Sequence, residues 1–189
     1  MEIKSAVFVK GSPRVEGLFD DGLPHIAFMG RSNVGKSSTI NALTKTKGLA
    51  RISGAPGATT HINLFLINNK FYIVDLPGYG FVKGSVGKRE VLHNTIEAYL
   101  RHSHTGAQTI VLIIDAKVGP TPDDLDILQT IEENNKRVVV AVNKIDRLKN
   151  SELKTQLAKI QKSIGEHVLV LYSAEKKIGL PSLLKAIGL

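Results

Sequence analysis

Residues 30–37, GRSNVGKS, match the pattern G-x-x-x-x-G-K-[ST], which is typical of loops that bind phosphate. Glycines let the backbone wrap around a phosphate, and Lys36 adds a cation over the terminal phosphates. Ser37 can offer its hydroxyl to Mg²⁺. The loop follows an apolar segment and opens a helical pattern, so the first N–H groups of that helix would also face the phosphates. The predicted phosphate-binding residues are Gly30, Arg31, Ser32, Asn33, Val34, Gly35, Lys36, Ser37 and Ser38.

The sequence NKID at residues 143–146 follows the apolar run VVVAV and could read the base of a nucleotide. Asp146 can accept two hydrogen bonds from guanine N1–H and its exocyclic amine, whereas adenine presents a mismatched edge. Asn143 can address the Hoogsteen edge of the base, and the aliphatic part of Lys144 can cover the ring. The N–H of Ala174, in YSA, could reach guanine O6. The predicted base-binding residues are Asn143, Lys144, Ile145, Asp146, Tyr172, Ser173 and Ala174.

The sequence DLPG at residues 75–78 has two interpretations. Alone it would be a turn that ends a strand, since Pro and Gly favour turns. After a phosphate-binding loop, Asp75 could hold the hydration shell of Mg²⁺ and the Gly78 N–H could bond a γ-phosphate oxygen. We therefore add four residues to the predicted nucleotide site: Asp75, Leu76, Pro77 and Gly78.

These motifs need strands and helices to position them, and the apolar runs predict six strands. The runs are short and rich in Val, Ile and Leu, as expected for strands that are buried on both faces. They cover residues 25–30, 62–67, 70–78, 109–115, 137–144 and 167–174. Helical patterns lie between several of them, over 36–45, 88–101, 121–135, 151–165 and 180–188.

Alternating strands and helices predict a doubly wound α/β fold, in which ligands bind at the carboxyl ends of the strands. Only the short NNK separates the apolar residues 62–67 from 71–75, which predicts a hairpin and therefore one antiparallel edge strand on a mostly parallel, six-stranded sheet. Helices should cover both faces of the sheet. Segments 10–24 and 78–88, rich in Gly and charge, are expected to be surface loops.

Length and composition suit one globular domain, residues 1–189, with residues 1–24 as an N-terminal extension packed on it. The formal charge of +8 favours phosphate-rich partners such as nucleic acid, although a solubilising excess of lysine would look the same. The absence of cysteine excludes disulfides, thiolate metal sites and a cysteine nucleophile. No apolar run is long enough to span a membrane, and the first residues do not resemble a signal peptide. We expect a cytoplasmic monomer with no membrane partner.

Four stretches of the sequence are similar to those of a known protein family, and the similarity extends along nearly the whole chain. They are GRSNVGKSS from residue 30, PGATTHIN at 56–63, DLPGYG at 75–80 and FVKGSP at 8–13. They resemble the bacterial EngB family of ribosome-biogenesis GTP-binding proteins, also called the YihA or YsxC group. The resemblance implies a Ras-like P-loop fold, binding of GTP and GDP, and slow hydrolysis with Mg²⁺. It also implies a role in assembling the large ribosomal subunit, with the subunit precursor and rRNA as partners and without a DNA partner.

The resemblance assigns further residues. It implies that Ser37, Thr59 and Asp75 bind Mg²⁺, although the adjacent Thr60 could serve if the loop shifts. It places the first nucleotide-sensing switch at Gly57, Ala58, Thr59, Thr60 and His61. Two features depart from the family pattern: NKID stands in place of the usual TKxD, and the helix over 88–101 lacks the expected tryptophan.

Hydrolysis should be slow, because Tyr79 stands where Ras-like proteins carry the glutamine that orients the attacking water. K⁺ held by Asn33, or a ribosomal partner, would then have to raise the rate. The residues expected to act in hydrolysis are Lys36, Asn33 and Thr59.

Two glycine-rich segments, 48–61 and 78–90, have the composition of switches. Lys83, Lys88 and Arg89 in the second would present positive charge to rRNA, unless they simply belong to a solvated loop. Two alternatives to a regulatory GTPase are a GTP-binding scaffold that does not hydrolyse GTP and a P-loop kinase with a non-ribosomal substrate.

Overall fold

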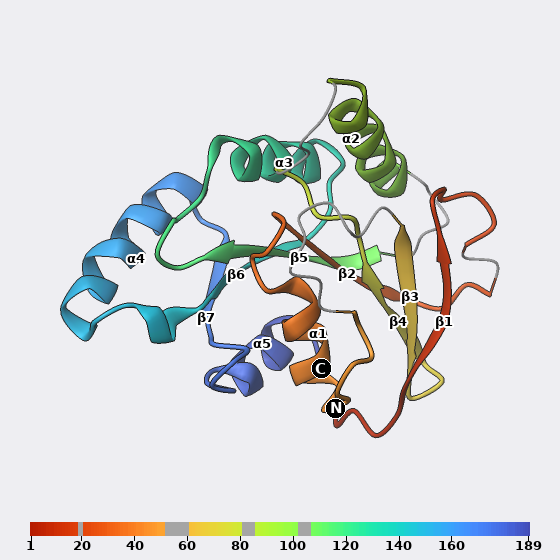
Figure 1. Cartoon of the computed structure of the whole chain (residues 1–189), viewed down its shortest axis with the longest axis horizontal. Coiled ribbons are helices and arrows are strands. Elements are labelled where there is room, and N and C mark those ends of the chain that lie inside the picture. Colours follow the sequence, from red (N-terminus) through yellow and green to blue (C-terminus); the bar gives the residue numbers. More distant parts are fainter. Residues whose placement is uncertain (19–20, 52–60, 81–85, 102–106) are drawn as a thin grey trace.

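One mixed sheet runs through the molecule, with helices against both of its faces (Figure 1). The computed structural model describes residues 1–18, 21–51, 61–80, 86–101 and 107–189. Its elements are β1 (Ala6–Ser12), β2 (His25–Gly30), α1 (Lys36–Leu43), β3 (Ile62–Ile67), β4 (Phe71–Asp75), α2 (Val86–Arg101), β5 (Ala107–Asp115), α3 (Pro122–Glu133), β6 (Val138–Asn143), the short 3₁₀ helix η1 (Ile145–Arg147), α4 (Asn150–Ile164), β7 (Val168–Leu171) and α5 (Leu180–Ala186).

The seven strands lie in the order β1-β3-β4-β2-β5-β6-β7. The pairs from β4 to β7 are parallel, whereas β3 runs antiparallel to both of its neighbours, β1 and β4. The predicted doubly wound, mostly parallel sheet and the hairpin of β3 and β4 are confirmed. This order brings the carboxyl ends of five strands, β4, β2, β5, β6 and β7, to one edge of the sheet.

The prediction of six strands was wrong by one, because it omitted β1. Residues 10–12, expected in a surface loop, belong to this strand and pair with Asn63 and its neighbours in β3. Most residues of β1 are exposed in the fold, although its sequence AVFVKGS begins with four apolar residues that could have indicated a strand. Backbone pairing and the side chain of Asn68, which hydrogen-bonds the backbone of Glu2, Lys4 and Ser5, hold it in place instead. As a result β1, not β3, forms the edge of the sheet.

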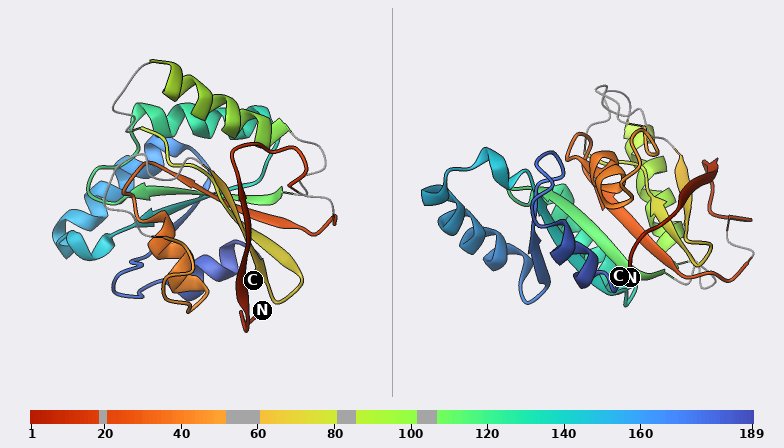
Figure 2. Two further views of the ribbon diagram at one scale, coloured as in Figure 1. Left: turned by 45° about the vertical axis from the view of Figure 1, so that its right-hand side comes forward. Right: turned by 90° about the horizontal axis from the view of Figure 1, so that it is seen from below.

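Alternate residues of the central strands enter two separate cores. Ala27 and Met29 of β2 pack with side chains of α2, α3 and α4, whereas Ile26 and Phe28 pack with side chains of α1 and α5. Figure 2 shows these two helical layers on opposite sides of the sheet. Burial on both faces explains why these strands appear as continuous apolar runs.

The helix ends follow their local chemistry. Thr121 caps α3, as predicted, and it forms a capping box with Asp124, while Pro122 occupies the first turn. Gly165 ends α4 with φ of 68°. Helix α2 begins at Val86, so it includes three residues that were expected in the preceding loop.

Within the described parts of the chain, no helix combines the length and apolar character that crossing a membrane requires.

Candidate nucleotide-binding site

The predicted site residues meet at the carboxyl edge of the sheet. Gly30, Asp75, Asp115 and Asn143 are the last residues of β2, β4, β5 and β6, and Asp115 lies directly opposite Asn143 in the strand register. Ligands of open α/β sheets bind at this edge. The fold therefore brings together three motifs that are spread over more than 100 positions of the sequence.

The phosphate-binding loop, residues 30–37, has a backbone that requires its glycines. Gly35 has φ of 101°, and a Cβ there would lie 2.3 Å from Nδ2 of Asn143. A Cβ on Gly30 would lie 2.8 Å from the carbonyl oxygen of Ile113. Helix α1 starts at Lys36 without a side-chain cap, so its first N–H groups are available to an anion at the loop.

Lys36 of this loop forms a buried ion pair with Asp75 at the end of β4. Both side chains are almost inaccessible to solvent, at 7% and 3%. Two charges buried at this depth depend on each other, because either one alone would be costly to remove from water. The pair shows that the DLPG motif reaches the phosphate-binding loop, and a phosphate or a cation there would compete for these two charges.

Asn143 connects three segments of the site. Its Nδ2 donates to the carbonyl oxygen of Val34 at 3.0 Å, and its Oδ1 accepts the N–H groups of Lys144 at 2.8 Å and Ala174 at 3.0 Å. The base contact of Asn143 that the sequence suggested stays a prediction. The Ala174 N–H, predicted to reach guanine O6, already has Asn143 as its acceptor. Asn143 is thus a positioning residue that joins the phosphate-binding loop to both base-binding segments.

Lys144 adds a second link between these segments. Its Nζ donates to the carbonyl oxygen of Asn33 and forms an ion pair with Asp115, both at 2.8 Å. Burial raises the pKa of the Asp115 carboxyl, but the hydrogen bond and charge of Lys144, together with the backbone N–H groups of Lys117 and Val118, outweigh burial, so this pKa lies below its ordinary value. With its ammonium fixed in this way, the aliphatic part of Lys144 is held beside the loop, where the prediction places the base.

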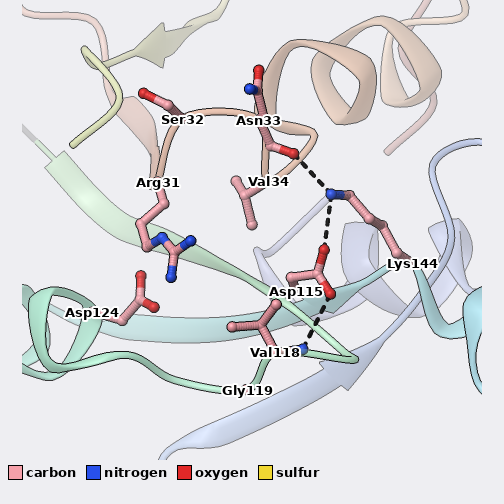
Figure 3. A pocket seen from close by; sticks show the side chains of 9 residues that line it. All are labelled: Arg31, Ser32, Asn33, Val34, Asp115, Val118, Gly119, Asp124 and Lys144. Atoms are coloured by element: carbon pink, nitrogen blue, oxygen red, sulfur yellow. Dashed lines mark hydrogen bonds and ion pairs between the residues drawn. The ribbon is translucent and has the colours of Figure 1, made fainter. Parts of the chain in front are cut away.

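A pocket of about 200 Å³ lies between the phosphate-binding loop and the segment after β5 (Figure 3). Figure 3 shows Arg31 pointing from the loop toward Asp124, and the side chain of Asn33 pointing away from Lys144. The lining residues are Arg31, Ser32, Asn33, Val34, Asp115, Val118, Gly119, Asp124 and Lys144.

The remaining base-binding residues lie in two short segments. Ile145 and the exposed Asp146 belong to η1, directly after Lys144. Ser173 is buried, and its backbone exchanges hydrogen bonds with Ile178, which closes the turn after β7. The side chain of Tyr172 is buried, and its hydroxyl is 2.8 Å from Oγ1 of Thr39 in α1. This contact joins the turn after β7 to α1, and the base contacts of these residues stay predictions.

The segment after β4 lies against the phosphate-binding loop. The Leu76 N–H donates to the carbonyl oxygen of Phe28, and both Leu76 and Pro77 are buried. A Cβ added to Gly78 would lie 3.3 Å from the Ser32 nitrogen. The backbone of Gly78 is thus directly beside the loop, as a contact with the terminal phosphate requires.

Four residues of the predicted first switch, Gly57 to Thr60, lie outside the described residues. The exposed His61 is described, and it immediately precedes β3. The roles of Thr59 or Thr60 at Mg²⁺, and of Thr59 in hydrolysis, stay predictions.

The oxygen donors that the structure describes suit Mg²⁺, which prefers carboxylate and hydroxyl oxygens together with water and phosphate. The Asp75 carboxylate contacts the loop lysine, and Ser37 is the second residue of α1, beside that lysine. These two residues could hold the ion beside a phosphate group. No group of three or more His, Cys, Asp or Glu side chains that could hold a metal ion occurs among the described residues.

Sequence reasoning missed two acids that the site uses, Asp115 and Asp124. A signal existed for each of them. Asp115 ends an apolar parallel strand, as Asn143 does, and Asp124 is the acid three positions after the N-cap Thr121.

The chain is similar to known GTP-binding proteins over most of its length. A family model described as "50S ribosome-binding GTPase" matches residues 25–144. The "Probable GTP-binding protein EngB" of Clostridium perfringens is 41% identical over 182 residues, which are 95% of this chain and 92% of the relative. The protein of the same description from Myxococcus xanthus is 37% identical over 188 residues, 95% of this chain and 91% of the relative.

Solved structures give the same result. A crystal structure of a probable GTP-binding protein EngB has a TM-score of 0.72 and 28% identity, covering 86% of this chain and 96% of that one. A crystal structure of Era, in complex with MgGDPNP and nucleotides 1506–1542 of 16S ribosomal RNA, has a TM-score of 0.70 and 31% identity, covering 87% of this chain and 55% of that one. The resemblance inferred from the motifs is confirmed: the chain belongs to the EngB family of GTP-binding proteins and carries a GTPase domain of the Ras-like fold.

Proposed function

We propose that this GTPase is a nucleotide-dependent switch in the assembly of the large ribosomal subunit. The observation that carries the proposal is the match to the family of 50S ribosome-binding GTPases over residues 25–144, which include the phosphate-binding loop, Asp75 to Gly78, and Asn143. A formal charge of +8 supports rRNA as the contacted component, because basic surfaces attract phosphate-rich polymers.

GTP or GDP would lie along the carboxyl edge of the sheet. Its phosphates would rest on residues 30–38, and its guanine would lie between η1 and the turn at 172–174. The exposed Asp146 would accept hydrogen bonds from the guanine edge. On binding, Lys36 would exchange its buried partner Asp75 for the terminal phosphates.

Mg²⁺ would be held by Ser37, Thr59 and the water shell of Asp75, and it would offset the negative charge of the β- and γ-phosphates. Once Lys36 bonds the phosphates instead, the Asp75 carboxylate would become available beside Ser37. Metal and nucleotide should therefore bind together.

The chain lacks the glutamine that orients the attacking water in Ras-like proteins. We therefore expect another factor to be needed to raise the rate of hydrolysis. One candidate is K⁺ near Asn33, whose side chain points away from Lys144 (Figure 3). The other is the ribosomal particle. Turnover should rise with K⁺ over Na⁺, or with large-subunit precursors. Equal rates in both salts, with and without particles, would contradict both versions.

Co-sedimentation with large-subunit precursors tests the ribosomal role directly. The protein, as a monomer, should bind the particles differently with GDP than with a non-hydrolysable GTP analogue, and binding should weaken as salt rises. Nucleotide-independent binding, or none at low salt, would contradict the proposal. A single-turnover assay with GTP and ATP separates the alternatives: a scaffold would not hydrolyse GTP, and a small-molecule kinase would be expected to accept ATP.

A further inference from the structure

Tyr79, the residue after Gly78, is turned away from the phosphate-binding loop and into the core. Its side chain is only 1% exposed, and its hydroxyl donates to Oδ1 of Asp124 at 2.9 Å. Burial and the neighbouring Asp124 carboxylate raise the pKa of this phenol well above its usual value. Tyr79 therefore cannot orient or deprotonate the attacking water, although it occupies the position of the glutamine that does so in Ras.

The acceptor of this hydrogen bond is itself rigidly held. Asp124 lies in the first turn of α3 and is 3% exposed. Its other oxygen, Oδ2, accepts the backbone N–H of Thr121 at 2.8 Å and the Thr121 hydroxyl at 2.7 Å. A buried carboxylate with hydrogen bonds to both oxygens has little freedom to move. The Tyr79 hydroxyl is thus attached to a fixed point on α3.

The backbone of Tyr79 is bonded to the phosphate-binding loop, whereas its side chain is bonded to α3. The carbonyl oxygen of Tyr79 accepts the Ser32 N–H at 2.9 Å, and Arg31 and Tyr79 form an isolated parallel bridge. Tyr79 therefore connects α3, through its side chain, to the phosphate-binding loop, through its backbone.

The two glycines that flank Tyr79 lie close to the phosphate-binding loop and to the start of α3. A Cβ on Gly78 would lie 3.3 Å from the Ser32 nitrogen. A Cβ on Gly80, whose φ is 88°, would lie 3.1 Å from Cγ of Arg31 and 3.2 Å from Oδ2 of Asp123. Residues 78–80 thus lie close to both the loop and the start of α3, although Gly80 itself is exposed, so their position depends on both.

We propose that Tyr79 is a positioning residue for the GTP-bound state. Its bond to Asp124 fixes residues 78–80 against the loop, so that the Gly78 N–H is in place for the γ-phosphate. This inference rests on the γ-phosphate contact of Gly78 in the proposed function, and it is independent of the ribosomal role. Since GDP has no γ-phosphate, the Tyr79 hydroxyl should matter for GTP and not for GDP.

The test compares Tyr79→Phe with a matched control, Tyr72→Phe. Each change removes one hydroxyl that donates to a carboxylate: Tyr79 to Asp124, and Tyr72 to Asp21 at 2.6 Å. Both rings belong to the same hydrophobic core, but Tyr72 lies near the amino end of β4, away from the nucleotide site. A general loss of stability should therefore appear in both variants.

The measurements are the affinities for GDP and for a non-hydrolysable GTP analogue, together with kcat and KM for GTP and the free energy of unfolding in urea. In Tyr79→Phe, affinity for the analogue should fall about fivefold relative to GDP, the effect of one hydrogen bond, and kcat should fall as well. In Tyr72→Phe the ratio of the two affinities should stay at the wild-type value. An unchanged ratio in Tyr79→Phe, or the same change in both variants, would overturn the proposal.

Asp124→Ala provides a second route if Tyr79→Phe does not fold. This change removes the acceptor of the Tyr79 hydroxyl, and it should shift the ratio in the same direction; an unchanged ratio would overturn the proposal equally. Because these assays use the protein alone, a failure to bind ribosomal particles would contradict the proposed function and leave the Tyr79 result valid. A wild-type protein that bound neither nucleotide would contradict both.

Discussion

Oδ1 of Asn143 accepts the backbone N–H of Ala174 at 3.0 Å, so the two segments expected to surround the base are bonded directly to each other. The same side chain donates to the carbonyl oxygen of Val34 in the phosphate-binding loop. A change in any one of the three segments must therefore be transmitted to the others through one buried amide.

Asn143→Ala should weaken both the fold and nucleotide binding. The change leaves the N–H groups of Lys144 and Ala174 and the carbonyl oxygen of Val34 without this partner in a buried region. We expect the free energy of unfolding to fall by about 2 to 4 kcal/mol and the affinity for GDP to fall roughly tenfold or more. Urea unfolding and fluorescent-nucleotide titration measure the two effects.

Asn68→Ala is the matched control for this prediction. Asn68 makes the same three kinds of hydrogen bond, accepting from Lys4 and Ser5 and donating to Glu2, but it lies at the exposed edge of the sheet. It should lower the free energy of unfolding by about 1 kcal/mol or less and leave GDP affinity unchanged. If both variants lost GDP affinity equally, Asn143 would have no specific role at the site.

Asp146→Asn should move base preference from guanine to xanthine. The carboxylate that accepts from N1–H and the exocyclic amine becomes an amide, which can donate to the second oxygen of xanthine. GTP affinity should fall by roughly two orders of magnitude or more, since unpaired polar groups at a base-reading site are strongly disfavoured. Competition titrations with GDP and XDP measure the change, and unchanged GDP affinity would refute the assignment of Asp146.

Lys36→Met should destabilise the nucleotide-free protein strongly. It removes the partner of the buried Asp75 carboxylate, and breaking a buried pair in this way costs about 3 to 5 kcal/mol. Glu97→Gln, which breaks the exposed pair of Arg101 and Glu97, should cost less than about 1 kcal/mol. Urea unfolding without nucleotide compares the two. Similar small losses would show that Asp75 does not depend on Lys36 for its stability.

His25 should make the protein sensitive to mild acid. This histidine begins β2 with its ring against Tyr72, and burial lowers its pKa from 6.5 to about 4, against the opposing charge of Asp21. In the unfolded chain the ring gains its proton at the higher pH. Stability is therefore complete above pH 6.5 and falls as the pH drops toward 4, by about 3 kcal/mol in total.

Urea unfolding between pH 4 and pH 7.5 tests this prediction. His25→Phe, which keeps a ring at the position, should flatten the profile in that range. The carboxyl of Asp21 accepts a hydrogen bond from Tyr72, which lowers its pKa below 3.8, so its own contribution is lost only in more acidic solution. Parallel profiles for the variant and the wild type would show that another group is responsible.

The sequence was sufficient to predict those parts of the site that depend on local chemistry. The loop at Gly30 to Ser37 and the segment at Asn143 to Asp146 have residue types and spacing that suit phosphate and guanine whatever surrounds them. The doubly wound sheet followed from short apolar runs, because strands buried on both faces leave that signal. These predictions needed no knowledge of which side chains would meet in space.

The contacts that hold the site together depend on packing, so the sequence could not reveal them. The bond from Tyr79 to Asp124 joins positions 45 residues apart, and it exists because α3 packs over this part of the sheet. Likewise, the sequence suggested a base contact for Asn143 but not its bonds to the protein. Strand β1 has mostly exposed side chains and pairs through its backbone, so only its four apolar residues could have indicated it.

The position of β1 has a consequence for aggregation. This strand covers the backbone of β3, whose sequence INLFLI is strongly apolar and rich in residues that favour strands. A truncated chain without its first twelve residues would expose the backbone N–H and C=O groups of β3 as an apolar edge strand. Other chains can add to such an edge as further strands and form amyloid-like assemblies. The irregular pairing between Phe8 and Lys10 makes β1 itself a poorer template for such growth. We therefore expect the first residues of the chain to protect β3 from pairing with other chains.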